Sequence, residues 1–207
     1  MSETALLGLF PLNTVLLPGE ILALHIFEER YKLLFGEILE DGFFGLVFIE
    51  PQGLHEIGCC ARVATVVDRL ADGRFNLIVQ GVRRFRLLEI QEPEDLEAQY
   101  IAALVEYVDD EDSRPPQALV DEVTAGFAEM LSLTGNEARE VSGGAEDLSF
   151  RVASKIDFGV EFKQGLLEEL REERRLELVL GMMKSMLPQL RMRKEREAAI
   201  RGNGKAY

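Results

Sequence analysis

Cysteine is scarce in this chain of 207 residues, which has only Cys59 and Cys60. Because the two are adjacent, they cannot build a disulfide framework or provide the C-x-x-C spacing of a metal-ligand pair. Unpaired cysteines usually behave as small apolar residues, and a reducing compartment suits them. We interpret the pair as two small residues of a strand, and we expect no metal site and no cofactor.

Long apolar runs are also missing, since none approaches the roughly 20 residues that a membrane-spanning helix requires. The first residues, MSETALLGLF, lack the positive segment that precedes the apolar core of a signal peptide. The hydrophobic content of 47% is enough for a globular core. We therefore expect a globular, cytoplasmic protein that does not enter a membrane.

Basic residues are few in the first half of the chain. Residues 1–112 contain 8 Lys and Arg against 21 Asp and Glu, a net charge of −13, whereas residues 113–207 contain 15 against 16. An acidic half repels phosphate backbones, so we do not expect nucleic acid as the main partner. The sequence RRFR at 83–86 is a local basic and aromatic patch, which leaves nucleic-acid binding open as an alternative. We prefer to interpret Arg83, Arg84 and Arg86 as members of a curled strand that alternate in and out of a barrel.

Histidine is equally rare, and neither His25 nor His55 lies near a recognisable nucleophile and a third, orienting group. The C-terminal sequence GNGKAY has part of a phosphate-loop pattern, but Ala199 stands where its first glycine belongs and Ala206 where Ser or Thr is required. The sequence therefore offers no catalytic residue and no ATP site.

The pattern from residue 61 to residue 90 predicts a long β-hairpin. Asp72-Gly73 is typical of a tight turn, and Phe75, Leu77 and Val79 then alternate with residues that are mostly polar, so that one face is apolar throughout. Gly81 interrupts the alternation, which indicates a bulge or bend where the strand curls into a barrel.

The second half of the chain is helical in pattern and begins after the break VDDEDSRPPQ at 108–117. Apolar residues follow at helical spacing: Leu119, Val120, Val123, Phe127, Met130 and Leu131. A second helix is expected at about 146–157, and apolar pairs between 166 and 187 predict further packing helices. We place a β-rich subdomain at 1–112, a helical bundle at 113–190 and a basic tail at 191–207, which we expect to be flexible and frayed beyond Pro188.

The stretch HIFEERY at 25–31 marks a strand-to-helix junction. The alternation of Leu22, Leu24 and Ile26 ends there, and Phe27, Tyr31, Leu34, Phe35 and Ile38 continue at helical spacing. Glu28 and Glu29 fall in the first helical turn, where carboxylates interact favourably with the helix dipole. Arg30 lies at the edge of the apolar stripe, within reach of a carboxylate or a strand carbonyl. We interpret the cluster as a structural anchor with Phe27 and Tyr31 on the inward face.

Seven stretches occur in the order expected of one known family: FPL at 10–12, VLLPGE at 15–20, LHIFEERY at 24–31, FFGLVF at 43–48, IGCCARV at 57–63, DGRFNLIVQGVRRFRL at 72–87 and YIAALVEYV at 100–108. In these stretches the chain resembles the N-terminal, substrate-binding domain of Lon protease, which also occurs in stand-alone proteins and in cereblon. Taken together with helical sequences up to residue 188, the resemblance suggests a stand-alone member. The signature residues, all given structural roles, are Phe10, Pro11, Leu12, Pro18, Ile26, Phe27, Glu28, Arg30, Tyr31, Gly45, Gly58, Asp72, Gly73, Gly81, Arg84 and Phe85.

The resemblance implies an α+β fold, with a PUA-like β pseudo-barrel followed by a C-terminal helical bundle. It implies a non-catalytic polypeptide-recognition module, an adaptor in protein quality control, whose partners are unfolded or extended polypeptides and a protease. The ATPase and Ser-Lys peptidase of Lon lie in later domains that the resemblance does not include, so we expect no enzyme activity. The zinc-bearing aromatic cage of cereblon cannot be built without tryptophan. The peptide-binding residues stay unknown, and the alternative is a nucleic-acid-binding PUA-like protein.

Overall fold

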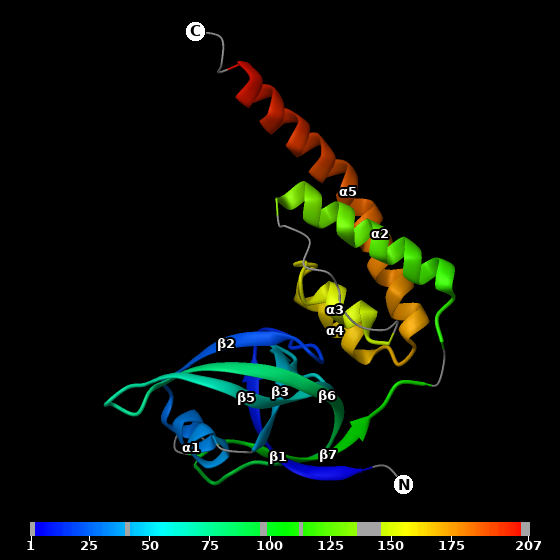
Figure 1. Ribbon diagram of the computed structural model, residues 1–207. Helices are drawn as coiled ribbons and strands as arrows, with labels where there is room; N and C mark the ends of the chain where they lie inside the picture. Colours follow the sequence, from blue (N-terminus) through cyan, green and yellow to red (C-terminus); the bar gives the residue numbers. More distant parts are fainter. Residues whose placement is uncertain (1–2, 40–41, 96–98, 112–113, 136–145, 204–207) are drawn as a thin grey trace. The chain divides into compact units, whose positions relative to one another are not determined.

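The chain divides into two compact units, which are described separately. The computed structural model describes residues 3–39, 42–95, 99–111, 114–135 and 146–203. The first unit, here called the strand unit, is Met1–Asp110 with Ser154–Leu170, and the second, the helical unit, is Glu111–Ala153 with Arg171–Tyr207 (Figure 1).

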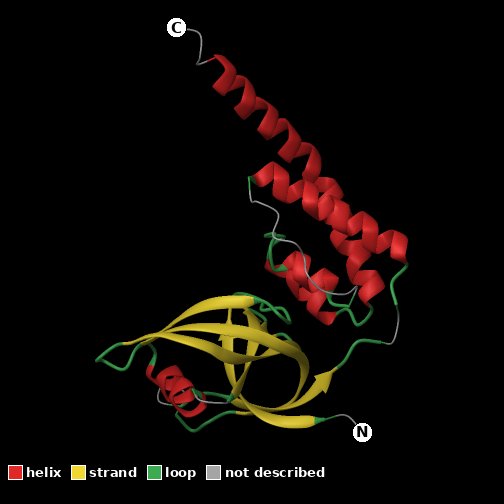
Figure 2. Cartoon of the chain, viewed as in Figure 1, coloured by secondary structure: helices red, strands yellow, loops and turns green. Residues whose placement is uncertain are grey.

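The strand unit is a closed sheet with two helices (Figure 2). Its order is β1-β7-β6-β5-β3-β4, and a parallel pairing of β1 with β3 joins the two sides into a ring, while β2 pairs with β6 outside this path. The elements are β1 (Thr4–Leu12), β2 (Ile21–Ile26), α1 (Glu29–Ile38), β3 (Phe43–Glu50), β4 (Gly53–Leu54), β5 (Ile57–Arg69), β6 (Phe75–Gln91), β7 (Ala102–Val108) and α4 (Val160–Glu168). The predicted α+β class with a pseudo-barrel is confirmed.

The predicted hairpin is β5 and β6, which pair antiparallel from Ile57↔Arg86 to Arg69↔Phe75. The turn closes through a hydrogen bond from the Gly73 N–H to the Leu70 carbonyl oxygen at 3.0 Å, and Gly73 has φ of +83°, a conformation that favours glycine. Phe75, Leu77 and Val79 are buried, as their alternation predicts.

Gly81 is a bend, as predicted. The register of the hairpin shifts here, because Cys60 pairs with Arg83 and Ala61 with Gly81, so β6 has one additional residue. A side chain at Gly81 would place its Cβ 2.2 Å from the carbonyl oxygen of Leu17. The Gly81 N–H donates to the Glu20 carbonyl oxygen, and the Gly19 N–H donates to the Gly81 carbonyl oxygen, both at 2.9 Å. Only glycine allows the segment before β2 to approach β6 this closely.

Two groups of apolar side chains fill the strand unit. The first is aromatic and lies under α1, where the Phe10 ring packs edge-to-face against Tyr31 and Phe35 and Phe35 packs against Phe44. The second is formed by residues of five different strands: Leu7, Leu9, Val47, Cys60, Phe85, Ala103 and Val105. The two cysteines are buried in β5, which confirms their interpretation as small strand residues.

The helical unit contains α2 (Gln117–Thr134), α3 (Leu148–Ala153) and α5 (Glu172–Asn203). Val123, Phe127, Met130 and Leu131 are buried on α2, in agreement with the predicted stripe. The helix ends at Gly135, whose φ of +74° and N–H bond to the Leu131 carbonyl oxygen form a left-handed cap.

Helices α2 and α5 run parallel to each other. Polar contacts between them include Lys184 with Glu122 at 2.6 Å, Arg191 with Glu129 at 2.6 and 2.9 Å, and Lys194 Nζ with the Ser132 carbonyl oxygen at 2.6 Å. The partners are 62 residues apart in every case, so both helices advance in the same direction.

Two predictions about the helical part are wrong. The helix expected at 146–157 is shorter, since α3 ends at Ala153. Residues 189–203 are not frayed as predicted, because α5 continues through Pro188 to Asn203, and the rest of the predicted tail, 204–207, lies outside the described residues. Proline in a helix costs about 3 kcal/mol, and beyond it Arg191 and Lys194 bond to α2.

The domain limits at residues 112 and 190 stay a prediction. In the structure the division falls after Asp110, and Ser154–Leu170, which includes α4, belongs to the strand unit. The sequence pattern predicts that α4 packs with the other helices of the second half. In the structure α4 contacts β5 and therefore belongs to the strand unit.

Replacing Gly81 by alanine tests the close approach at the bend. We expect Gly81→Ala to lower the free energy of unfolding by about 1–3 kcal/mol, because the new methyl group meets a backbone atom and β6 must shift. Gly36→Ala is the matched control: no atom lies within 4 Å of the added Cβ, so the substitution on α1 should be neutral or stabilise by up to about 1 kcal/mol. Chemical denaturation measures both, and equal effects would contradict the steric explanation.

Candidate functional site

The strand-to-helix junction places its two aromatic signature residues on opposite sides. Tyr31 is buried, with 7% of its surface exposed, and its ring centroid lies 4.5 Å from that of Phe10. Phe27 is 59% exposed and stacks on His25 with ring centroids 6.0 Å apart. The prediction that Phe27 faces inward is therefore wrong. Phe27 precedes Glu28, the extended residue at the N-cap of α1, so helical spacing does not apply to it.

The charged residues of the junction bind one another. Arg30 donates from Nε and Nη2 to the Glu28 carboxylate at 3.0 and 2.7 Å, and its guanidinium carbon lies 4.6 Å from the centre of the Tyr31 ring. Lys32 pairs with Glu29 at 2.7 Å. Exposed pairs of this kind contribute at most about 1 kcal/mol. Each group therefore has a local partner, and the role of Arg30 as a structural anchor stays a prediction.

Three signature residues far apart in sequence form one close-packed cluster. A Cβ on Gly45 would lie 2.8 Å from the Phe85 ring, and a Cβ on Gly58 would lie 2.6 Å from it and 2.7 Å from the Leu46 carbonyl oxygen. Phe85 is fully buried. The two glycines thus provide the space that the ring occupies inside the barrel.

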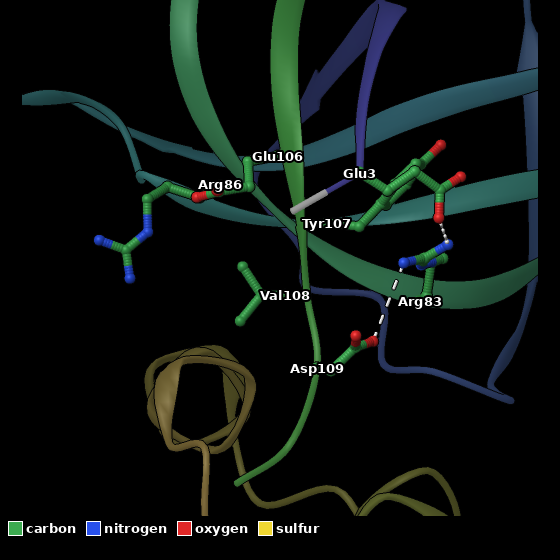
Figure 3. Close-up of a pocket in the computed structure, with 7 residues that line it drawn as sticks. All are labelled: Glu3, Arg83, Arg86, Glu106, Tyr107, Val108 and Asp109. Atoms are coloured by element: carbon green, nitrogen blue, oxygen red, sulfur yellow. Dashed lines mark hydrogen bonds and ion pairs between the residues drawn. The ribbon is translucent and has the colours of Figure 1, made fainter. Parts of the chain in front are cut away.

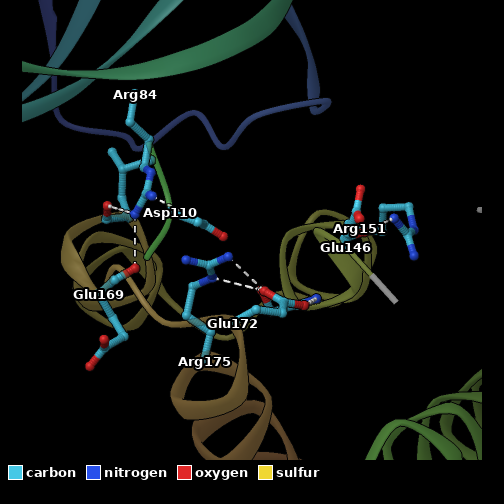
Figure 4. Close-up of polar contacts among 9 residues, drawn as sticks. Arg84, Asp110, Glu146, Arg151, Glu169, Glu172 and Arg175 are labelled. Atoms are coloured by element: carbon cyan, nitrogen blue, oxygen red, sulfur yellow. Dashed lines mark hydrogen bonds and ion pairs between the residues drawn. The ribbon is translucent and has the colours of Figure 1, made fainter. Parts of the chain in front are cut away.

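Arg84 is the most buried of the three RRFR arginines, with 3% of its surface exposed. Its Nη1 donates to the Leu167 carbonyl oxygen at 3.1 Å and to the Glu169 carbonyl oxygen at 2.8 Å, and its Nη2 pairs with the Asp110 carboxylate (Figure 4). These carbonyls belong to the end of α4 and the residue after it. Arg84 therefore holds α4 on the strand unit and is not available to a nucleic acid.

Arg83 borders an open hollow of about 500 Å³ together with Arg86, Tyr107 and three carboxylates (Figure 3). Its Nη1 donates to Glu3 at 2.8 Å, its Nη2 lies 3.8 Å from Asp109, and its guanidinium carbon lies 3.8 Å from the centre of the Tyr107 ring. The pKa of Tyr107 is raised to about 12, mainly by burial, so the phenol stays neutral. Since three carboxylates outnumber the two arginines here, this hollow does not favour phosphate.

A second hollow, of about 530 Å³, contains His55. The two ring nitrogens of His55 are hydrogen-bonded to carboxylates, Nε2 to Glu50 at 3.1 Å and Nδ1 to Glu168 at 3.2 Å. Burial lowers the pKa of His55, but the two hydrogen-bonded carboxylates outweigh it, and the net shift of the pKa is upward. The imidazole connects the β3–β4 hairpin with Glu168 at the end of α4. Gln164, in the middle of α4, also donates to the Ile57 carbonyl oxygen at 3.0 Å.

The other signature residues lie apart from these clusters. Pro11 and Leu12 end β1 and Pro18 precedes β2, all partly buried, and Ile26 is buried at the end of β2. Asp72 is exposed at the hairpin turn and accepts bonds from the Arg74 N–H at 3.2 Å and from Arg74 Nε at 2.8 Å. The signature residues therefore do not converge on a single site, and their roles stay predictions.

The helical unit contains a buried ion pair that the sequence pattern did not reveal. Glu172 and Arg175 pair at 2.7 Å, the Ser149 N–H and hydroxyl donate to the Glu172 carboxylate at 2.9 and 2.6 Å, and Arg175 lies over the Phe150 ring (Figure 4). Glu172 and Arg175 belong to the sequence EELREERR at 168–175, whose many charges suggest a solvent-exposed helix face. The one available signal is the i, i+3 spacing of Glu172 and Arg175 next to the apolar Leu176.

Several apolar side chains are more than a third exposed on the strand unit and offer surface for binding: Leu6, Ile21, Phe27, Phe43, Val66, Val67, Leu88 and Ile90.

Burial raises the pKa of both the Cys59 and Cys60 thiols, which makes them poor nucleophiles. Within the described ranges no group of three His, Cys, Asp or Glu could hold a metal ion. No helix in those ranges is long and apolar enough to cross a membrane.

Comparison with protein families finds one match that extends over most of the chain. The model of the ATP-dependent protease La (LON) substrate-binding domain matches residues 7–185. Lon protease of Anaeromyxobacter dehalogenans is 26% identical over 96% of this chain, and that of Paraburkholderia phytofirmans is 32% identical over 72% of it. The chain spans 25% and 19% of the length of these two relatives.

Two solved structures share the fold. A Lon N-terminal domain protein from Xanthomonas campestris has a TM-score of 0.69 and 27% identity, and the match includes 86% of this chain and 98% of that one. The N-terminal domain of Mycobacterium avium complex Lon protease has a TM-score of 0.64 at 16% identity, with 87% and 98% of the two chains included. The family resemblance drawn from the seven stretches is confirmed.

Substitution of the two junction aromatics separates core from surface. We expect Tyr31→Ala to lower the free energy of unfolding by about 3–5 kcal/mol, because it empties a buried aromatic site against Phe10. Phe27→Ala, at the exposed position four residues earlier, should change it by less than about 0.5 kcal/mol. Denaturant titration of both variants provides the comparison, and an unchanged midpoint for Tyr31→Ala would disprove the packing role.

Protonation of His55 should stabilise the strand unit. Because the folded-state pKa is raised, this contribution is fully present below the ordinary histidine pKa of about 6.5 and is lost as pH rises through the folded value. The stability difference between the native protein and His55→Gln should therefore be larger at about pH 5.5 than at about pH 8.5. Unfolding curves at the two pH values measure it, and a difference independent of pH would refute the linkage.

Proposed function

Since the chain belongs to the ATP-dependent protease La (LON) substrate-binding domain family, we propose that it is a non-catalytic module that recognises unfolded or extended polypeptides. The observation that carries this proposal is the family match over residues 7–185. We further propose that it acts in the cytoplasm, as an adaptor in protein quality control that presents polypeptides to a protease. The free thiols of Cys59 and Cys60 suit that reducing compartment.

The surface of the strand unit supports binding of this kind. Exposed apolar residues such as Ile21, Phe27 and Val67 can contact the apolar side chains that an unfolded polypeptide presents. The net charge of −13 over residues 1–112 attracts basic segments without selecting a particular sequence. Such a surface favours weak, sequence-tolerant binding.

The alternative, binding of a nucleic acid at RRFR, has less support. Arg84 is buried against α4, and Arg83 is paired with Glu3 and lies over Tyr107. Arg86 is the one arginine of the three whose side chain has no hydrogen bond or ion pair to any part of the chain that the structure describes. A single unpaired cation makes a small footprint for a phosphate backbone.

Salt dependence distinguishes the two functions. We expect fluorescently labelled extended peptides rich in apolar and basic residues to bind weakly, and the affinity to fall only partly between about 50 mM and about 500 mM salt, because salt screens the charges but leaves apolar contacts in place. A labelled single-stranded RNA should not bind. Fluorescence anisotropy with both probes measures this.

The result that would overturn the proposal is the reverse pattern. If peptides failed at both salt concentrations while RNA bound with an affinity falling log-linearly with salt, the chain would be a nucleic-acid-binding protein. Arg83→Gln and Arg86→Gln would then weaken binding of RNA and reduce the salt slope.

A further inference from the structure

Strand β2 has an open edge. Ile21–Ile26 pairs with β6 along its whole length, and among the residues that the structure describes no second strand pairs with it (Figure 1). In an antiparallel pair every second residue directs its N–H and C=O away from the partner strand. The described chain makes no backbone hydrogen bond to these outward groups. A regular row of donors and acceptors therefore faces outward along β2.

The opposite side of the same ribbon shows how this fold protects an edge. Beyond Arg62, the last residue that pairs with β3, β5 also has β6 as its only strand partner within the described ranges. That segment carries two register irregularities, at Val63/Thr65 and Val66/Asp68, and ends with the charged residues Asp68 and Arg69. Bulges and charges are the usual means by which proteins prevent pairing with another chain.

Strand β2 has none of these protections. Its register with β6 is uninterrupted from Ile21↔Gln80 to Ile26↔Phe75, and its sequence ILALHI contains no proline and no Asp, Glu, Lys or Arg. The exposed residues on one face are Ile21, 62% exposed, Ala23 and His25, and the exposed ring of Phe27 continues this row. An added strand would therefore find apolar neighbours beside an open backbone.

We propose that β2 is the docking strand for an extended polypeptide, which adds to the sheet as a further strand beside β2. This inference rests on the proposed function and specifies where and how the polypeptide binds. Main-chain hydrogen bonds supply most of the affinity, and alternate side chains of the polypeptide pack beside Ile21, Ala23 and Phe27.

Charge favours a foreign polypeptide over a second copy of the chain. Glu20 immediately precedes β2, and Glu28 and Glu29 follow it after Phe27. Antiparallel pairing of two copies would bring these acidic ends together and would join two halves that each carry −13 over residues 1–112. A segment with apolar and basic residues meets no such repulsion.

Amide hydrogen exchange measured by NMR tests the docking directly. The probe is a blocked heptapeptide in which valine and lysine alternate, and its binding is followed in parallel by fluorescence anisotropy. Without peptide, every second amide of Ile21–Ile26 should exchange rapidly, since it has no acceptor. With saturating peptide these same amides should become protected, whereas the amides of the β5 edge at residues 63–69 should be unchanged.

A matched pair of variants adds a second readout. Ile21→Lys and Val67→Lys place the same side chain at two positions of similar exposure, 62% and 55%, on opposite edges of the ribbon. Lysine at position 21 removes an apolar cross-strand neighbour and repels the basic probe, so we expect affinity for the peptide to fall about fivefold. Val67→Lys should change it by less than about twofold, and both variants should keep the native unfolding midpoint because neither residue is buried.

Each other result has a definite meaning. If the peptide binds while the exchange of the β2 amides is unchanged, the docking strand is refuted but polypeptide recognition stands. If the peptide does not bind, both proposals fail. If the β2 amides become protected with rising protein concentration in the absence of peptide, the strand pairs with a second copy and the proposal is overturned.

Discussion

Gly81 is the position at which β6 changes its neighbour. Before it, β6 pairs with β2, and after it, with β7. The change requires the chain before β2 to pass so close to β6 that no side chain fits, and two backbone hydrogen bonds fix it there. β6 can therefore take part both in the closed ring, where it pairs with β7, and in the pairing with β2 outside the ring. The open edge of β2 follows from this arrangement. Because β2 lies outside the closed ring of strands, it pairs with β6 on one side and with no described strand on the other.

Arg84 is the second constraint in the same strand, three residues later. Burying a guanidinium is costly unless its donors are satisfied. Its acceptors are carbonyl oxygens at the C-terminal end of α4, which lack partners within their own helix and lie at the negative end of the helix dipole. Arg84 thus caps a helix that follows it by about 80 residues in sequence, and this contact is one of those that attach α4 to the strand unit.

The parts of the fold that sequence predicts are those with local causes. The turn at Gly73, the alternation from Phe75 and the apolar stripe of α2 depend on neighbours within a few residues, and all three are observed. The helical period does not predict the side of Phe27 correctly, because Phe27 lies before the N-cap, where the backbone is still extended. Beyond Pro188, α5 bonds to Glu129 and Ser132, about 60 residues away in sequence, and no local pattern contains that information.

The candidate site was less predictable for a related reason. The RRFR sequence suggests three similar arginines, yet their partners, Glu3, Asp109, Asp110 and the end of α4, give each a different environment. Gly45, Gly58 and Phe85 could be recognised as signature residues, but the single packing cluster that they form is visible only once three strands are placed side by side. The open edge of β2 is a property of pairing, and a sequence does not state which edges remain unpaired.

An open edge addresses a difficulty that exposed apolar residues alone do not. Folded proteins also expose much apolar surface, so apolar contact by itself discriminates poorly between folded and unfolded polypeptides. Backbone groups discriminate better, because a folded chain pairs nearly all of its buried N–H and C=O groups within its own helices and sheets. Only a segment that is extended and unpaired can complete the row of donors and acceptors on β2. In the proposed binding mode, pairing with β2 therefore selects segments that are extended and unpaired. The neighbouring apolar side chains and the acidic charge then adjust the affinity among such segments.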